Sequence, residues 1–260
     1  MKQLLVITLL LSISCSSAWA ESPEEKGLAI AQKADQLDTG WGDQKQTLEM
    51  ILRNRQGQES RRLIRGRSLE VTGDGDKALS IFDSPADVKG TAFLSFTHVN
   101  EPDDQWLYLP ALKRVKRIAS KNKSGPFMGS EFAFEDMSSQ EVDKYTYKWL
   151  RDEKLDGKDV HVIERVPVDK YSGYTRQVVW MDMAIYQALK IEFYDRKNAL
   201  LKTLTFMGYN QYLDKYWRPE QMSMINHQNG KSTELTFSDY SFNNGYTDRD
   251  FDRNSLKRAR

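Results

Sequence analysis

Three carboxylates stand close together in the middle of the chain, at Glu131, Glu135 and Asp136. Two such groups can act as acid and base in glycoside cleavage, which makes a hydrolase the enzymatic alternative for this protein. A structural role is the nearer explanation, because Glu135 or Asp136 can accept hydrogen bonds from the first amides of a short helix over 136–143. No cluster of polar substrate-binding residues accompanies them, so we expect no enzymatic activity.

Other motifs of catalysis and cofactor binding are missing from the sequence. It has no Gly-x-Ser-x-Gly elbow, no His-Glu-x-x-His, no phosphate-binding glycine loop and no dinucleotide fingerprint. The histidines His98, His161 and His227 lie far apart, which favours ordinary hydrogen-bonded side chains over metal ligands. We therefore expect neither a cofactor nor a metal site.

The densest positive charge lies at Lys113, Arg114, Lys116 and Arg117. In a strand these side chains point alternately to the two faces. Two explanations remain open: the charges protect an edge strand from pairing with another sheet, or they form a docking patch for a headgroup or partner at the rim of a cavity. Nucleic acid is not an expected partner, because the formal net charge is only +1.

Methionines and aromatic residues that could bind an acyl chain are spread along the sequence. Methionine is flexible enough to adapt to ligands of irregular shape, although core packing explains many of these residues equally well. The predicted cavity and lid residues are Trp106, Tyr108, Phe127, Met128, Phe132, Phe134, Met137, Trp149, Trp180, Met181, Phe193, Met207, Met222 and Met224. Burying about ten methylenes there would contribute on the order of 8 kcal/mol before binding entropy is subtracted, which leaves a reversible affinity suited to a carrier.

The segment 105–137 is predicted to form two short strands followed by a lid. Pro110 separates the strands 105–109 and 112–118, and glycines and a proline then favour turns. The large apolar side chains of the lid would each forfeit roughly 1.5–3 kcal/mol in water. The lid must therefore fold against protein or cover an apolar cargo.

The pattern outside this segment predicts a mainly β protein with an N-terminal helix. Ser22-Pro23-Glu24-Glu25 has a cap residue, a proline at the first helical position and a glutamate three residues after the cap, so a helix should run to about Leu37. Alternating strands are predicted at 44–54, 59–71, 77–82, 91–98, 105–109, 112–118, 144–154, 159–167, 175–182, 187–194, 199–209, 217–226 and 231–242. The short turns between them favour an antiparallel meander, curled either into a filled barrel or into an open one with an apolar hollow.

Residues 1–20 have the order of a secretory signal peptide: a lysine, an apolar run and Ala18-Trp19-Ala20. We expect cleavage before Glu21, with 21–260 as a single exported domain. Cys15 could instead be a lipoprotein acylation site, but Ser12 occupies the position where such signals usually carry leucine.

Several motifs resemble the outer-membrane lipoprotein-sorting protein family related to LolA. They are Trp106-Leu107-Tyr108-Leu109-Pro110-Ala111-Leu112-Lys113-Arg114-Val115-Lys116-Arg117-Ile118, Phe127-Met128-Gly129-Ser130-Glu131-Phe132, Phe134-Glu135-Asp136 and Tyr216-Trp217-Arg218-Pro219. The resemblance implies a half-open, unclosed antiparallel β-barrel of about 11–13 strands, with an apolar concave face covered by a helix and a lid loop.

The same resemblance implies a function in the periplasm. Members of the family carry lipoproteins or lipids, so it implies an acyl-bearing cargo and transfer to an outer-membrane acceptor. It also implies an inner-membrane RND/MMPL-type permease as partner. A structural adaptor of such a permease, with a filled interior and no bound lipid, is the non-carrier alternative.

Overall fold

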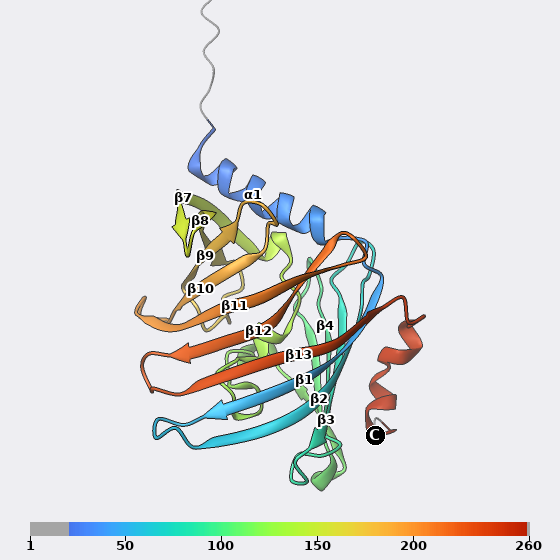
Figure 1. Cartoon of the computed structure of the whole chain (residues 1–260). Coiled ribbons are helices and arrows are strands. Elements are labelled where there is room, and N and C mark those ends of the chain that lie inside the picture. Colours follow the sequence, from blue (N-terminus) through green and yellow to red (C-terminus); the bar gives the residue numbers. More distant parts are fainter. Residues whose placement is uncertain (1–20, 259–260) are drawn as a thin grey trace, which may run out of the picture.

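The computed structural model describes residues 21–258, which form one helix, α1 (Pro23–Asp38), and a curved 13-stranded sheet (Figure 1). The strands are β1 (Asp43–Arg53), β2 (Glu59–Leu69), β3 (Lys77–Ser84), β4 (Ala92–Phe96), β5 (Asp104–Leu109), β6 (Arg114–Ile118), β7 (Tyr145–Leu155), β8 (Lys158–Pro167), β9 (Arg176–Asp182), β10 (Ala188–Tyr194), β11 (Leu200–Tyr212), β12 (Tyr216–Asn226) and β13 (Ser232–Phe242). The predicted mainly β, unclosed antiparallel architecture is confirmed. The signal-peptide prediction lies outside the described residues.

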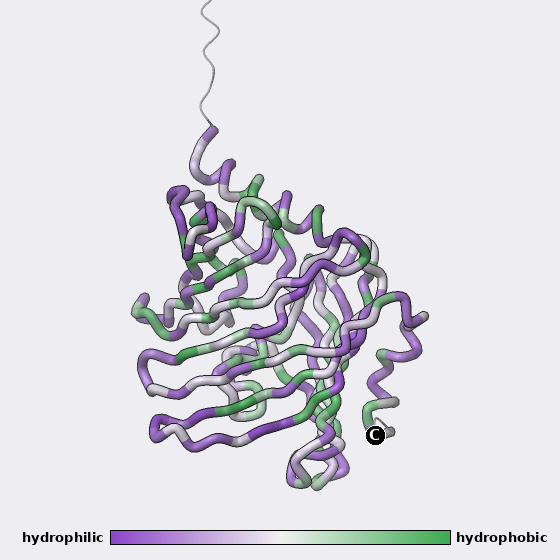
Figure 2. The backbone as a smooth tube through the Cα atoms, in the orientation of Figure 1, coloured by the Kyte–Doolittle hydropathy of each residue, from purple (hydrophilic) through white to green (hydrophobic). Residues whose placement is uncertain are grey.

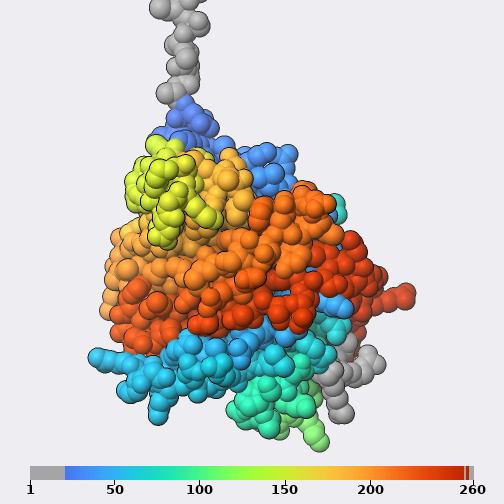
Figure 3. All heavy atoms as spheres, viewed as in Figure 1, coloured from blue at the N-terminus to red at the C-terminus, as the bar shows by residue number. Residues whose placement is uncertain are grey.

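The sheet order is β6-β5-β4-β3-β2-β1-β13-β12-β11-β10-β9-β8-β7, with every neighbouring pair antiparallel. The first and last strands therefore meet in the middle, and Figure 3 shows orange-red β13 directly against blue β1. The edge strands β6 and β7 come from the middle of the chain and are joined by residues 119–144.

Helix α1 begins as predicted, with a reciprocal cap. Ser22 Oγ accepts a hydrogen bond from the Glu25 amide, and the Glu25 carboxylate accepts one from the Ser22 amide at 2.8 Å. The helix packs on β7 at Gly27, where an added Cβ would lie 2.7 Å from the Trp149 amide nitrogen, so only glycine permits this approach. Within residues 21–258 no helix is long and apolar enough to cross a bilayer.

Side chains alternate between the two faces of the sheet, which gives the hydropathy pattern along the strands in Figure 2. The concave face holds the main apolar core, including Met50, Ile64 and Phe193. A smaller cluster lies on the convex face of β3–β5, where Phe251 and Leu256 from the C-terminal 3₁₀ helices cover it.

Residues 119–144 form no strand. Their 3₁₀ helices are η2 (Ser120–Asn122), η3 (Phe127–Gly129), η4 (Phe134–Met137) and η5 (Val142–Lys144). The predicted helix over 136–143 is therefore wrong. The chain leaves η4 because the Ser139 amide donates to Thr97 Oγ1 of the sheet at 3.1 Å instead of continuing a helix.

Candidate functional site

A cavity of about 960 Å³ lies on the concave face, partly open to solvent. It is bounded by α1, by residues 132–142 of the segment that joins the sheet edges, and by strands from both halves of the sheet. Its volume is at the upper end of the range for small-molecule sites. The predicted apolar hollow thus exists, between the protein's own elements.

An apolar row forms one wall of this cavity. Register places Ile163, Val179, Ile191, Leu204 and Met224 opposite one another across five adjacent strands, β8 to β12. Because side chains directly opposite one another share a face, the row is continuous. All of these residues belong to the concave core, and all except Met224 line the cavity.

A second concave row, two residues further along the same strands, is mostly polar. Register pairs Arg165 with Gln177, Gln177 with Phe193, Phe193 with Lys202, and Lys202 with Asn226. Lys202 and Asn226 are buried at the end of the row that residues 119–144 cover. Arg165 and Gln177 line the cavity.

Residues 119–144, here called the inserted segment, fill the concave face beside β2–β5 with aromatic rings. Phe127 is fully buried, and its ring centroid lies 5.1 Å from that of Phe93 and 5.6 Å from that of Phe134, both edge-on. Arg62 of β2 donates to the Met128 carbonyl oxygen. This part of the predicted lid is a packed plug, not a loose cover.

A buried ion pair ties the plug to β11. Lys202 Nζ donates to Asp136 Oδ2 at 2.7 Å and to the Glu131 carbonyl oxygen at 2.8 Å, and its side chain is only 4% exposed. Asp136 also accepts hydrogen bonds from the Tyr174 hydroxyl and the Ala133 amide. Burial raises the pKa of Tyr174, so the hydroxyl remains a donor.

The other two carboxylates weighed for hydrolysis also have structural partners. Glu131 Oε2 accepts a hydrogen bond from the Asn226 side chain at 2.7 Å. Glu135 accepts from Ser172 Oγ at 2.7 Å and from the Gly173 amide at 2.8 Å, and burial raises its pKa. Each carboxylate therefore serves to hold the segment in place.

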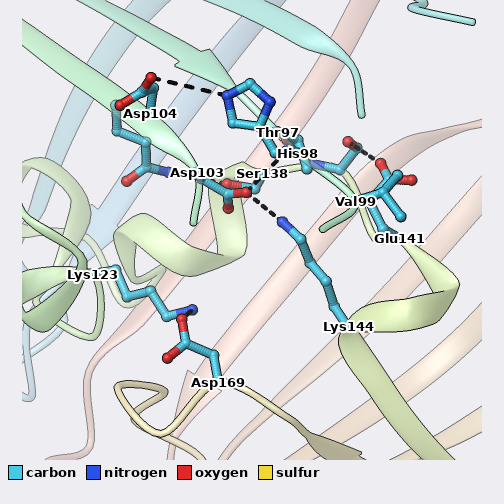
Figure 4. Close-up of polar contacts among 12 residues, drawn as sticks. Thr97, His98, Val99, Asp103, Asp104, Lys123, Ser138, Glu141, Lys144 and Asp169 are labelled. Atoms are coloured by element: carbon cyan, nitrogen blue, oxygen red, sulfur yellow. Dashed lines mark hydrogen bonds and ion pairs between the residues drawn. The ribbon is translucent and has the colours of Figure 1, made fainter. Parts of the chain in front are cut away.

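Ion pairs bridge the two halves of the sheet at either end of the segment. Figure 4 shows Lys123 directed at Asp169, at 2.7 Å, and Lys144 directed at Asp103. Lys123 follows edge strand β6, whereas Asp169 follows β8; Lys144 precedes edge strand β7, whereas Asp103 precedes β5. The open side of the barrel is thus closed by side chains instead of by strand pairing.

Acidic side chains gather along the part of the cavity lined by α1. Asp35 and Asp38 come from the helix, and Asp76 and Glu141 lie nearby. Burial, reinforced by Glu141, raises the pKa of Asp76 to about 7. Asp38 is paired with Arg218 Nη1 at 2.7 Å, although burial still raises its pKa.

The structure brings together only some of the predicted cavity residues. Phe132, Met137, Met181, Phe193 and Met222 line the cavity. The following residues pack in or against the concave core without lining it: Phe127, Met128, Phe134, Trp149 and Met224.

The placement of the remaining residues in the cavity is corrected. Trp106 and Tyr108 belong to the convex cluster covered by the C-terminal helices, and Trp180 belongs to a separate convex cluster on β8 and β9. Met207 is 41% exposed. Strict alternation is the reason: Trp180 adjoins the inward-facing Met181, so both cannot face the same side.

The basic residues predicted as a rim lie away from the cavity lining, on and beside edge strand β6. Lys113 adopts a left-handed backbone conformation at the end of η1 (Pro110–Leu112), and Arg114 and Lys116 are exposed. Arg117 forms an ion pair with Asp104 of β5. Whether they dock a partner remains a proposal.

Sequence reasoning missed Arg165, Gln177 and Lys202. The signal was present, because alternation from Ile163 puts Arg165 on the apolar face and alternation from Leu204 does the same for Lys202. A charged residue at an apolar-face position is uncommon and points to a specific partner.

The open sheet wrapped around a helix-covered cavity is a LolA-like fold. A LolA superfamily protein from Nitrosomonas europaea superposes with a TM-score of 0.69 at 21% identity, over 88% of this chain and 98% of that chain. At that identity the likeness concerns the fold alone, and it confirms the resemblance predicted from the motifs.

Closer similarities define the family. A crystal structure described provisionally as an outer membrane lipoprotein-sorting protein domain, from Vibrio parahaemolyticus, is 64% identical, with a TM-score of 0.89 over 90% of this chain and 99% of that chain. A DUF1329 family protein from Desulfovibrio piger is 31% identical, with a TM-score of 0.86 and the same coverage.

The chain belongs to the DUF1329 family. A family model described as an uncharacterized protein also matches residues 74–258. Curated protein sequences contain no significant match.

Proposed function

We propose that this protein is a periplasmic carrier that shelters the acyl chain of a lipid or lipoprotein in its concave cavity. The main support is the cavity of about 960 Å³, which is lined by the apolar row from Ile163 to Leu204 and is not filled by the inserted segment. The description of the 64% identical relative as a lipoprotein-sorting domain supports the same function.

Export and delivery complete the proposal. The signal peptide predicted at residues 1–20 would place the mature chain in the periplasm. Transfer to an outer-membrane acceptor, with an RND/MMPL-type inner-membrane permease as partner, follows from the motif resemblance. The proposed docking patch consists of four exposed cations on and beside β6: Lys113, Arg114, Lys116 and Arg117.

The two alternatives receive less support from the geometry. A hydrolase would need free carboxylates, whereas Glu131, Glu135 and Asp136 are held by structural hydrogen bonds. An adaptor would need no cavity. An unfilled cavity of this volume lowers the packing energy of the core, and a protein that binds no ligand would gain nothing in return.

Native mass spectrometry of protein isolated from the periplasm tests the proposal. Wild-type protein should carry a lipid adduct. Ile191→Trp, on β10 inside the cavity, should lose the adduct. Leu189→Trp should keep it, because a β-bulge between Ala188 and Lys190 shifts the alternation and Leu189 packs against the convex cluster of β8 and β9. Lipid-free wild-type protein, or equal adducts in both variants, would contradict a carrier that uses this cavity.

A further inference from the structure

The two cations in the polar row of the concave face, Lys202 and Arg165, differ in whether a carboxylate pairs with them. Lys202 is neutralised by Asp136, a carboxylate of the inserted segment. Arg165, in the same row but in the cavity, has no carboxylate within ion-pair distance among residues 21–258. Its neighbour Glu164 pairs with Arg176 on the other face instead. Arg165 is therefore the position in the row that the protein's own chain leaves uncompensated.

The guanidinium of Arg165 is held in a fixed orientation. Its Nε donates to Gln177 Oε1 at 2.8 Å, and its guanidinium carbon lies 4.7 Å from the centroid of the Tyr145 ring. Gln177 is itself only 3% exposed. This arrangement occupies Nε, and within residues 21–258 no hydrogen bond engages Nη1 or Nη2, which can therefore make the paired contact of guanidinium with carboxylate or phosphate.

The other cations on the cavity lining are not available to bind an anion in place of Arg165. Arg218 is paired with Asp38 and donates to Gln44. Arg67 directs its guanidinium toward Tyr246 in the convex cluster.

The lining carboxylates do not compensate Arg165 either. They are Asp35, Asp38, Glu70, Asp74, Asp76, Glu135, Asp136 and Glu141. Each lies beyond ion-pair distance of Arg165, and several already have close partners: Glu135 accepts from Ser172, Asp136 pairs with Lys202 and Asp38 pairs with Arg218.

We propose that Arg165, oriented by Gln177, binds the anionic headgroup of the cargo. This inference rests on the proposed carrier function and narrows it to acyl amphiphiles with a carboxylate or phosphate head. Arg165 lies two residues from Ile163, and Gln177 lies two from Val179, so a bound head would stand beside the apolar row along which the chain can lie.

Binding of matched probes to the mature protein tests this assignment. The probes are a fluorescent polyene fatty acid and its methyl ester, which differ only in headgroup charge. Wild type should bind the acid more tightly than the ester. Arg165→Gln should raise the Kd for the acid by about tenfold or more and leave the Kd for the ester unchanged, and Arg165→Lys should lie between.

Arg176→Gln is the matched control, because it removes the same charge from the convex face, where the Arg176 guanidinium stacks on Tyr194. It should leave both affinities unchanged. Displacement of the acid by a lysophosphatidic acid or by a second fatty acid of equal chain length shows whether phosphate or carboxylate is preferred.

Two results would overturn the headgroup assignment but not the proposed carrier function. One is equal affinity of the wild type for acid and ester, and the other is an equal loss of affinity for acid and ester in Arg165→Gln. Failure of wild type to bind either probe would instead contradict the carrier itself. Thermal unfolding of each variant checks that it is folded.

Discussion

The concave face contains two regions built from the same kinds of strand but completed differently. Beside β2–β5 the chain fills the face with its own segment, through Phe127, and the Lys202–Asp136 pair ties that segment to β11. Beside β8–β11 the same face remains hollow, and Arg165 pairs with no carboxylate among residues 21–258. For the proposed carrier the difference is expected: the filled region stabilises the fold, and the hollow region leaves space for the packing contacts of a ligand.

The largest effect is expected from removing the ring at the centre of the filled region. Phe127→Ala should lower the free energy of unfolding by about 3–5 kcal/mol, because Phe127 is fully buried among other rings. Urea denaturation measures this, with the exposed Met207→Ala as control. A loss below about 1 kcal/mol would mean that the plug is not part of the stable core.

Lys202→Met should destabilise the protein by about 3 kcal/mol, because it leaves the Asp136 carboxylate buried without its cation. The value lies at the low end of such losses since Tyr174 and the Ala133 amide still donate to Asp136. Combining it with Asp136→Asn should restore part of the stability. If the losses in free energy of unfolding of the two single variants simply add in the double variant, Lys202 and Asp136 are not energetically coupled.

A matched pair of enlargements compares the two regions directly. Ile64→Phe, in the filled core of β2, should cost about 1–3 kcal/mol through overpacking. Ile191→Phe, on the cavity wall, should cost less than about 0.5 kcal/mol because space is present. Equal costs in chemical denaturation would show that the cavity collapses in solution.

The smallest effect concerns pH. Because the pKa of Asp76 is raised to about 7 in the folded state, above its unfolded value, its protonation favours folding below the unfolded pKa. That contribution is lost as pH rises through about 7. Asp76→Asn should remove this decline, so its stability relative to wild type should rise between pH 4 and pH 8, measured by thermal unfolding at both pH values. An identical pH profile would contradict the raised pKa.

The sequence predicts those features that depend on local periodicity. Ser22 and Glu25 mark the start of α1, and alternation identifies the strands to within a few residues. The sequence predicts the cavity lining less well, because residue type alone favours Trp106 and Trp180 as cavity residues, whereas both lie in convex clusters. The Lys202–Asp136 and Arg165–Gln177 contacts join distant parts of the chain, and only the register of the sheet brings them together.

The seam between β1 and β13 has a consequence for how the molecule is made. Contacts such as Leu48 opposite Phe237 link the first strand in the sequence to the last, and such distant contacts form slowly. Before they form, the N-terminal and C-terminal meanders each present an unpaired strand that invites aggregation. The sheet thus cannot be completed until β13 is available for pairing. Protection from proteases and chaperone assistance therefore matter most before that last strand has joined the sheet.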